Sequence, residues 1–78
     1  MGTPIKHRDT ILLRKIGSRI RELRLQKGLS QIEFANRCDV ELSTINRIEL
    51  GKASPSLTLL FIMAKELKVT AAELITVN

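Results

Sequence analysis

The side chains that could perform covalent chemistry in this 78-residue chain are few and far apart. The chain holds one histidine, His7, which falls in an expected flexible arm, and one cysteine, Cys38, which falls in an expected turn. The sequence contains no glycine-rich phosphate loop and no His, Cys, Asp or Glu residues at metal-ligand spacing. We therefore predict that the chain is not an enzyme and uses no metal, no cofactor and no small-molecule ligand.

Positive charge is the more informative chemical property of the sequence. Thirteen Lys and Arg residues against eight Asp and Glu residues give a net charge of +5 at pH 7. Residues 1–27 hold eight basic and two acidic side chains (net +6), whereas residues 28–53 hold three and four (net −1). A basic segment of this kind favours a polyanionic partner, nucleic acid first and a membrane surface second.

Composition also indicates the cellular compartment and the kind of side chains in the core. A single cysteine excludes an internal disulfide and fits a reducing compartment. No apolar run is long enough to span a bilayer and no secretory signal is visible, so we expect a cytoplasmic protein without membrane association. Two Phe and no Trp or Tyr make an aliphatic core the expectation, and the first helix lacks the large aromatics of a membrane-surface helix.

Periodicity and capping residues predict five helices that would position the charged groups, in an all-α fold. We expect residues 1–8 to be a flexible arm or else a non-native leader, and residues 9–78 to form one domain. The first helix, about 9–27, ends before Gly28 and carries an inward stripe of Leu12, Leu13, Ile16, Ile20 and Leu23. The second begins at Ser30, where Ser30 and Glu33 form a capping box, and ends near residue 37 or 38. Its apolar positions are Ile32, Phe34 and Ala35.

The remaining three helices follow the same signals. A turn with positive φ at Asp39 leads into a third helix, about 42–50, whose inward residues are Ile45 and Ile48. The fourth helix spans about 57–68, and its expected inward stripe is Leu57, Leu60, Phe61, Ala64 and Leu67. Thr70 and Glu73 form a second capping box that opens a short fifth helix.

Residues 31–50 form the unit to which we assign the function. Two short helices joined by a four-residue turn allow the second helix to protrude into a DNA major groove, about 12 Å wide, while the first braces it. Bracing requires a small residue at the helix crossing, here Ala35, and apolar residues beneath the protruding helix, here Val40, Ile45 and Ile48. The same pattern also fits an ordinary three-helix packing corner.

Three motifs carry a more specific resemblance. They are Ser30-Gln31-x-Glu33, Ser43-Thr44-Ile45-x-x-Ile48-Glu49-x-Gly51 and Ala64-x-x-Leu67. With these motifs the chain resembles the lambda-repressor-like helix-turn-helix family of phage repressors, Cro proteins, restriction–modification controllers and antitoxins, over roughly residues 12–76. The resemblance implies a compact five-helix fold and a transcriptional regulator that binds double-stranded DNA sequence-specifically, as a homodimer on two half-sites. Such a regulator acts by occupying DNA, and so by blocking or recruiting polymerase.

The resemblance also assigns roles to single residues. Bases in the major groove would be read by the outward residues of the helix at about 42–50, which are Leu42, Ser43 and Arg47. Arg47 can bond guanine O6 and N7, and Leu42 can contact a thymine methyl group. Backbone phosphates would be contacted by Gln31, Thr44, Asn46, Lys52 and Arg24. A solvated side chain remains the alternative for Gln31 and Arg47, and Arg14, Arg19 and Arg21 are either a solvated face or further DNA contacts.

The family pattern implies one structural ion pair, and this chain departs from the pattern at three positions. Arg24 is expected to pair with Glu49 and so to fix the recognition helix to its scaffold. Asp39 replaces the Gly that is usual in the turn. Cys38 replaces a small Ala, and we expect it to be a buried hydrophobe rather than a redox thiol. Glu41 replaces the usual Ser or Thr cap, which places a negative charge near the expected phosphates.

The sequence has more apolar residues than one small core needs, which suggests that some of them form an interface. A helix that is apolar on more than one face is usually covered by another surface. We predict that Leu59, Ile62, Ile75 and Val77 form a symmetric dimer interface, with half-sites about 34–36 Å apart on the DNA. The alternative function is a protein-interaction adaptor, such as an antitoxin that binds a partner protein, because the segment 28–53 is nearly neutral.

Overall fold

The computed structural model describes residues 7–77, which form five α-helices. Their bounds are α1 (His7–Gln26), α2 (Gln31–Cys38), α3 (Leu42–Glu49), α4 (Leu57–Leu67) and α5 (Ala71–Ile75). Strands are absent from residues 7–77, which confirms the predicted all-α class. Residues 1–6 of the expected arm lie outside the described residues, and α1 already begins at His7, two residues before its expected start. None of the described helices is long and apolar enough to cross a bilayer.

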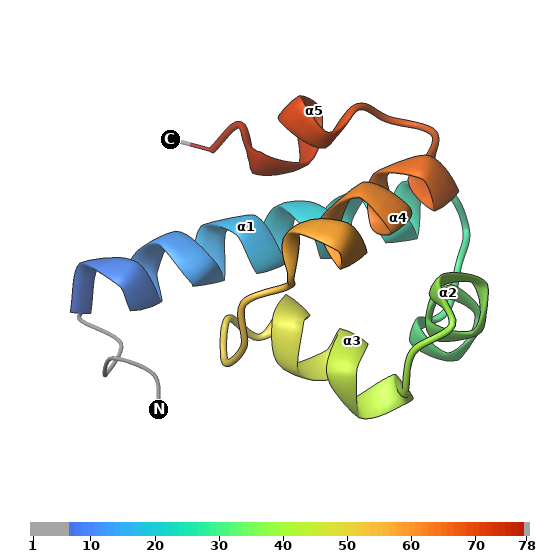
Figure 1. Ribbon diagram of the computed structural model, residues 1–78, viewed down its shortest axis with the longest axis horizontal. Coiled ribbons are helices and arrows are strands. Elements are labelled where there is room, and N and C mark those ends of the chain that lie inside the picture. The colour runs from blue at the N-terminus through green and yellow to red at the C-terminus, as the bar shows by residue number, and fades with distance from the viewer. Residues whose placement is uncertain (1–6, 78) are drawn as a thin grey trace.

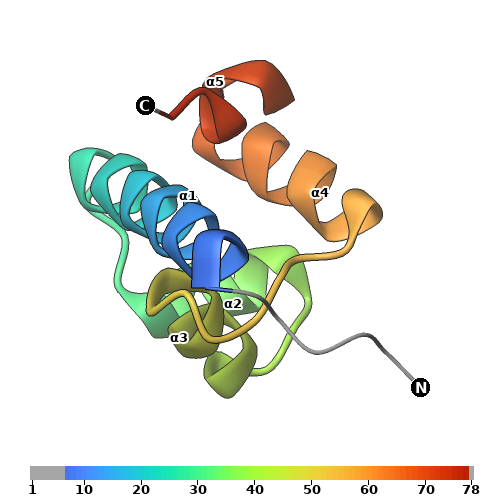
Figure 2. The ribbon, with the colours of Figure 1, turned by 90° about the vertical axis from the view of Figure 1, so that its left-hand side faces the viewer.

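The helices are arranged in three tiers around α1. Figures 1 and 2 show α1 and α4 in the middle tier, α5 on one side of them and the α2–α3 pair on the other. Helix α1 contacts α3 and α5, and helix α4 contacts α2 and α5. The core between the tiers is aliphatic except for one aromatic ring, and its fully buried large side chains are Ile20, Phe34, Ile45, Ile48, Met63, Leu67 and Leu74.

The predicted caps and turns fix the helix ends. The hydroxyl of Ser30 accepts a hydrogen bond from the Glu33 backbone N–H (3.0 Å), and the Glu33 carboxylate accepts one from the Ser30 N–H (3.0 Å). The hydrogen bond from the Ser30 backbone N–H lowers the pKa of Glu33, and the hydrogen bond with the Ser30 side chain lowers it further. Thr70 and Glu73 repeat the box at α5. Asp39 adopts the predicted positive φ (56°), so α2 ends where expected.

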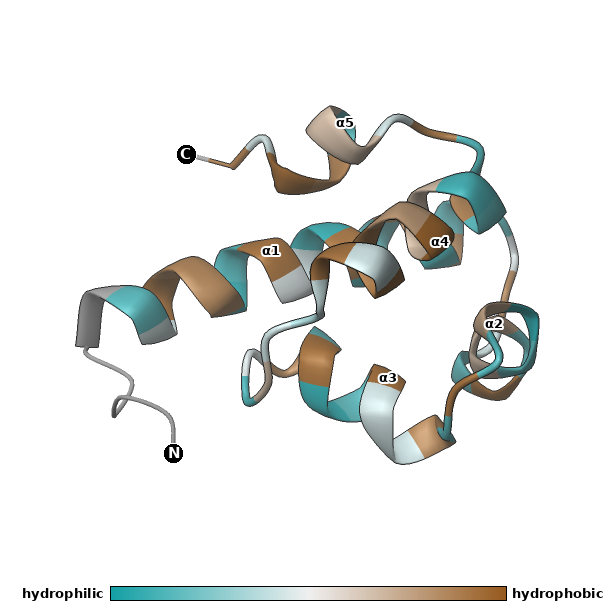
Figure 3. Ribbon diagram, viewed as in Figure 1, coloured by the Kyte–Doolittle hydropathy of each residue, from teal (hydrophilic) through white to brown (hydrophobic). Residues whose placement is uncertain are grey.

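Several residues predicted to face inward are exposed. Leu12 lies on the first part of α1, which extends beyond the other helices in Figure 1, and it is exposed. Ile32 on α2 is exposed, and Leu57 and Phe61 on α4 are 72% and 58% exposed. The prediction for Leu57 and Phe61 was wrong because α4 has two apolar faces. Figure 3 colours this helix as hydrophobic along most of its length. The core takes the face formed by Leu60, Met63, Ala64 and Leu67.

The four residues predicted to form a dimer interface differ in their exposure. Leu59 is partly buried and packs against the core. Ile62 and Ile75 are exposed and Val77 is partly buried. The apolar surface that α4 leaves open is therefore formed by Leu57, Phe61 and Ile62.

Candidate nucleic-acid interface

Helix α3 has one buried face and one open face. Ile45, Ile48 and Glu49 face the interior, whereas the open positions are Leu42, Ser43, Asn46 and Arg47, with Thr44 half-buried. Eight residues at 1.5 Å per residue make a rod about 12 Å long. The three residues predicted to read bases and the predicted phosphate contact Asn46 therefore stand on the exposed side of this helix.

The turn before α3 sets its direction. Ala35 is buried at the α2–α3 crossing, and its carbonyl oxygen accepts a hydrogen bond from the Val40 backbone N–H (3.0 Å). Glu41 is the N-cap residue of α3, and its side chain forms no capping hydrogen bond. Helix α3 therefore begins without the side-chain cap that α2, α4 and α5 all have.

A buried ion pair fixes the other end of α3 to α1. Arg24 Nε donates to Glu49 Oε2 over 2.6 Å and Arg24 Nη2 donates to Glu49 Oε1 over 2.9 Å, while Arg24 Nη1 donates to the Leu29 carbonyl oxygen over 2.7 Å. Both residues are only 5% exposed. The expected Arg24–Glu49 pair is thus present, and its bidentate geometry is the strongest form of such a contact. Because Arg24 is buried and used in this way, the structure does not support its expected second role as a phosphate contact.

A chain of hydrogen bonds leads from this pair to the open face of α3. Gln31 Nε2 donates to Glu49 Oε1 over 3.0 Å, and Asn46 Nδ2 donates to Gln31 Oε1 over 3.4 Å. Gln31, predicted from the sequence as a phosphate contact, is thereby also a link between the ion pair and Asn46. It is partly exposed, so one N–H of its amide remains available to an outside acceptor.

The sequence reasoning missed Gly17, which lets α1 and α3 approach each other. A Cβ atom at this position would lie 2.3 Å from the Ile48 carbonyl oxygen and 2.7 Å from that of Glu49. Gly51, which follows α3 with φ of 74°, packs in the same way against the backbone of Arg14. A glycine inside a helix costs about 1 kcal/mol relative to alanine, so its presence in the helical pattern is a signal that could have drawn attention to Gly17.

Cys38 is a buried hydrophobe, as predicted. It is 2% exposed at the end of α2, and it is a free thiol. Burial, and to a lesser degree the charge of Glu66, raises the pKa of the thiol to about 11. A thiol with such a pKa is protonated and unreactive at neutral pH. No group of three or more potential metal ligands occurs within residues 7–77.

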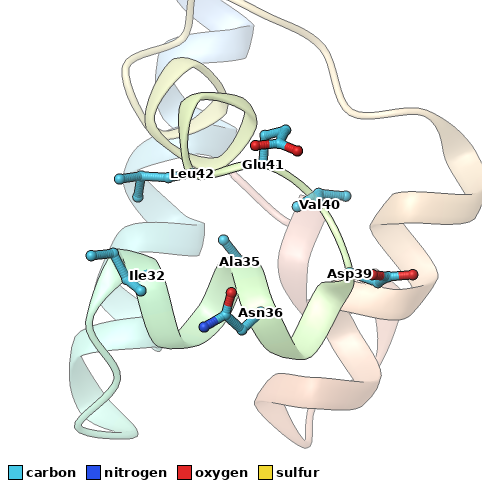
Figure 4. A pocket seen from close by; sticks show the side chains of 7 residues that line it. All are labelled: Ile32, Ala35, Asn36, Asp39, Val40, Glu41 and Leu42. Atoms are coloured by element: carbon cyan, nitrogen blue, oxygen red, sulfur yellow. The ribbon is translucent and has the colours of Figure 1, made fainter.

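The groove between α2 and α3 has the wrong charge for a nucleic acid. Figure 4 shows Ile32 and Leu42 extending to the same side of Ala35. Asp39 and Glu41 line this groove of about 620 Å³, and no Lys or Arg does. Two carboxylates repel phosphate, so a DNA backbone would be contacted elsewhere, at the side where Gln31 and Asn46 lie and at Lys52, which is exposed after α3.

Sequence comparison places the chain among transcriptional regulators. Residues 20–74 match the family described as Helix-turn-helix. Over 61 residues, 78% of this chain and 79% of its relative, the sequence is 33% identical to the uncharacterized HTH-type transcriptional regulator y4dJ of Sinorhizobium fredii. The matched segment contains α2, α3 and α4 complete, together with the second part of α1.

Solved structures agree with this. The restriction-modification controller protein C.AhdI from Aeromonas hydrophila is similar with a TM-score of 0.77 and 37% identity, over 80% of this chain and 94% of that one. The hypothetical transcription factor NHTF from Neisseria has a TM-score of 0.81 at 23% identity, over 99% and 87% of the two chains, which supports the fold alone. The exposed face of α3, the buried ion pair behind it and the family match together show that this chain belongs to the helix-turn-helix family of DNA-binding transcriptional regulators.

Proposed function

We propose that the chain binds double-stranded DNA sequence-specifically by inserting α3 into the major groove. The observation that carries the proposal is the division of α3 into a buried face of Ile45, Ile48 and Glu49 and an open polar face that includes Ser43 and Arg47. A helix held rigidly from behind can present its open side chains to base edges at a fixed register.

The exposed residues of α3 can each make a different kind of contact with DNA. The guanidinium of Arg47 can donate two hydrogen bonds to guanine O6 and N7, and the hydroxyl of Ser43 can donate or accept. Leu42 offers apolar contact to a thymine methyl group. Gln31, Thr44, Asn46 and Lys52 are the proposed phosphate contacts, since amides, hydroxyls and cations all bind phosphate oxygens.

We further propose that the protein acts as a homodimer on a two-fold operator. The exposed apolar side chains Leu57, Phe61 and Ile62 on α4, together with Ile75 at the end of α5, support it. Apolar surface of this kind is stabilised when a second copy covers it. A two-fold dimer requires half-sites about 34–36 Å apart, which is one turn of DNA.

The salt dependence of duplex binding tests this function against the adaptor alternative. For a DNA-binding protein that neutralises several phosphates, the affinity falls with a log–log slope of about −0.9 per phosphate. We expect such a slope on random-sequence duplex, and enrichment of one motif when bound duplexes are selected from a random pool. Binding that is weak at low salt and independent of salt would contradict the proposal and favour an adaptor that binds a partner protein.

A further inference from the structure

Four arginines of α1 have side chains that the structure describes, and two of these have protein partners while two do not. Arg24 is buried against Glu49, and Arg19 donates from Nε to the Glu73 carbonyl oxygen (3.2 Å) and lies 3.9 Å from the Glu22 carboxylate. Within residues 7–77, the guanidinium groups of Arg14 and Arg21 form no hydrogen bond or ion pair. Both are exposed, so their charges are free to bind an anion.

The two unpaired arginines line one cleft. Its volume is about 480 Å³, and α1 contributes Arg14, Ser18 and Arg21 to it. These residues are four and three positions apart, which places them on one face of the helix. Helices α2 and α3 contribute Gln31 and Asn46, the same polar pair that is linked to the ion pair.

The net charge of the cleft is positive. Glu49 forms part of its wall, but its carboxylate is neutralised by the two hydrogen bonds from Arg24. Arg14 and Arg21 then contribute two uncompensated positive charges, separated by seven residues and hence by about 10 Å along α1. That separation allows them to contact different phosphates of one strand, because phosphates follow each other every 3.4 Å along the DNA axis.

We propose that this cleft receives the DNA backbone and that Arg14 and Arg21 each bind a phosphate. Helix α1 then adds two sequence-independent contacts to those of the helix-turn-helix unit. The inference rests on the proposed function and goes beyond it, because it assigns a binding surface to a helix outside α2 and α3. It also assigns a role to two of the eight basic residues in the positively charged segment 1–27.

Single substitutions by glutamine, Arg14→Gln and Arg21→Gln, test the proposal. Each should reduce the magnitude of the salt slope by about 0.9, and at 0.15 M salt this corresponds to an affinity about fivefold lower. The loss should be the same on selected and on random duplex, because phosphate contacts carry no sequence information. Arg21→Lys keeps the charge and should keep the slope.

Lys15→Gln is the matched control. Lys15 is exposed on the same helix but lines a different hollow, which Arg19, Glu22 and Val77 share and which Arg14 also borders. The Lys15→Gln substitution should leave the salt slope unchanged. If the wild-type protein binds duplex but the two arginine variants retain its slope, or if Lys15→Gln lowers the slope as much as they do, the cleft proposal is wrong. If the wild-type protein binds no duplex, the proposed function itself fails.

Discussion

Gln31 donates its side-chain N–H to Glu49 over 3.0 Å, and this bond joins the first residue of α2 to the last residue of α3. The same Glu49 oxygen accepts from Arg24, so one buried carboxylate connects three helices. The helix that we expect to contact DNA is thereby held by its own scaffold before any DNA is present. This preorganisation is what a helix that reads bases at a fixed register requires.

Removing the carboxylate should destabilise the fold strongly. Glu49→Ala leaves the Arg24 guanidinium buried without its partner, at a cost of about 3–5 kcal/mol in the free energy of unfolding. Urea denaturation of the two proteins measures the difference. The double variant Arg24→Met/Glu49→Met should recover most of the stability, because no charge is then left unpaired. A single variant as stable as wild type would show that the pair does not fix α3.

Gly17→Ala should also destabilise the protein, although alanine favours helix. The gain in helix propensity is about 1 kcal/mol, whereas the new Cβ would meet the backbone oxygens of Ile48 and Glu49. Overpacking typically costs about 1–3 kcal/mol, so we expect a lower melting temperature. Ser18→Ala, at the exposed neighbouring position, is the control and should change stability by less than about 0.5 kcal/mol. Equal melting temperatures for the two variants would contradict the close approach of α1 and α3.

The buried thiol of Cys38 should make the stability depend on alkaline pH. Its pKa is about 11 in the folded protein, against an ordinary value of 9.0, so folding favours the protonated thiol. This contribution is complete below pH 9 and is lost as the pH rises from about 9 to 11, because the unfolded chain then releases its proton first. Comparing urea unfolding of wild type and Cys38→Ala at pH 8 and pH 10.5 isolates it. The prediction is contradicted if the difference in unfolding free energy between wild type and Cys38→Ala is the same at both pH values.

Phe61→Glu should disrupt the proposed dimer. It places a charge in the middle of the exposed apolar surface of α4, where a second copy would have to bury it at a high cost. Sedimentation should give a dimer for wild type and a monomer for the variant at the same concentration. Ile32→Glu is the matched control, since Ile32 is 57% exposed against 58% for Phe61 but lies on α2. If wild type is a monomer at tens of micromolar with DNA present, the dimer proposal is wrong.

Local signals allowed much of the fold to be predicted. The Ser30–Glu33 and Thr70–Glu73 capping boxes and the positive φ of Asp39 depend only on residues a few positions apart, and all three are confirmed. The Arg24–Glu49 contact spans 25 residues, and it was accessible only through the family resemblance.

Features that depend on packing between helices could not be predicted. Helix α4 has two apolar faces, and only the packing of the helices decides that Leu59 is partly buried while Phe61 is exposed. The arginines of α1 look alike in the sequence, and only the folded chain separates Arg19, held by Glu73, from Arg21, which lines the cleft.

The most direct test of the central claim is the base preference of wild type and Arg47→Ala, measured by selecting bound duplexes from one random pool. For wild type we predict a motif of two inverted half-sites one DNA turn apart. For Arg47→Ala we predict the same motif with the preference lost at one base pair in each half-site and affinity reduced by about 1–3 kcal/mol. Unchanged preference at every position, or an equal loss of affinity on all sequences, would contradict base reading by α3.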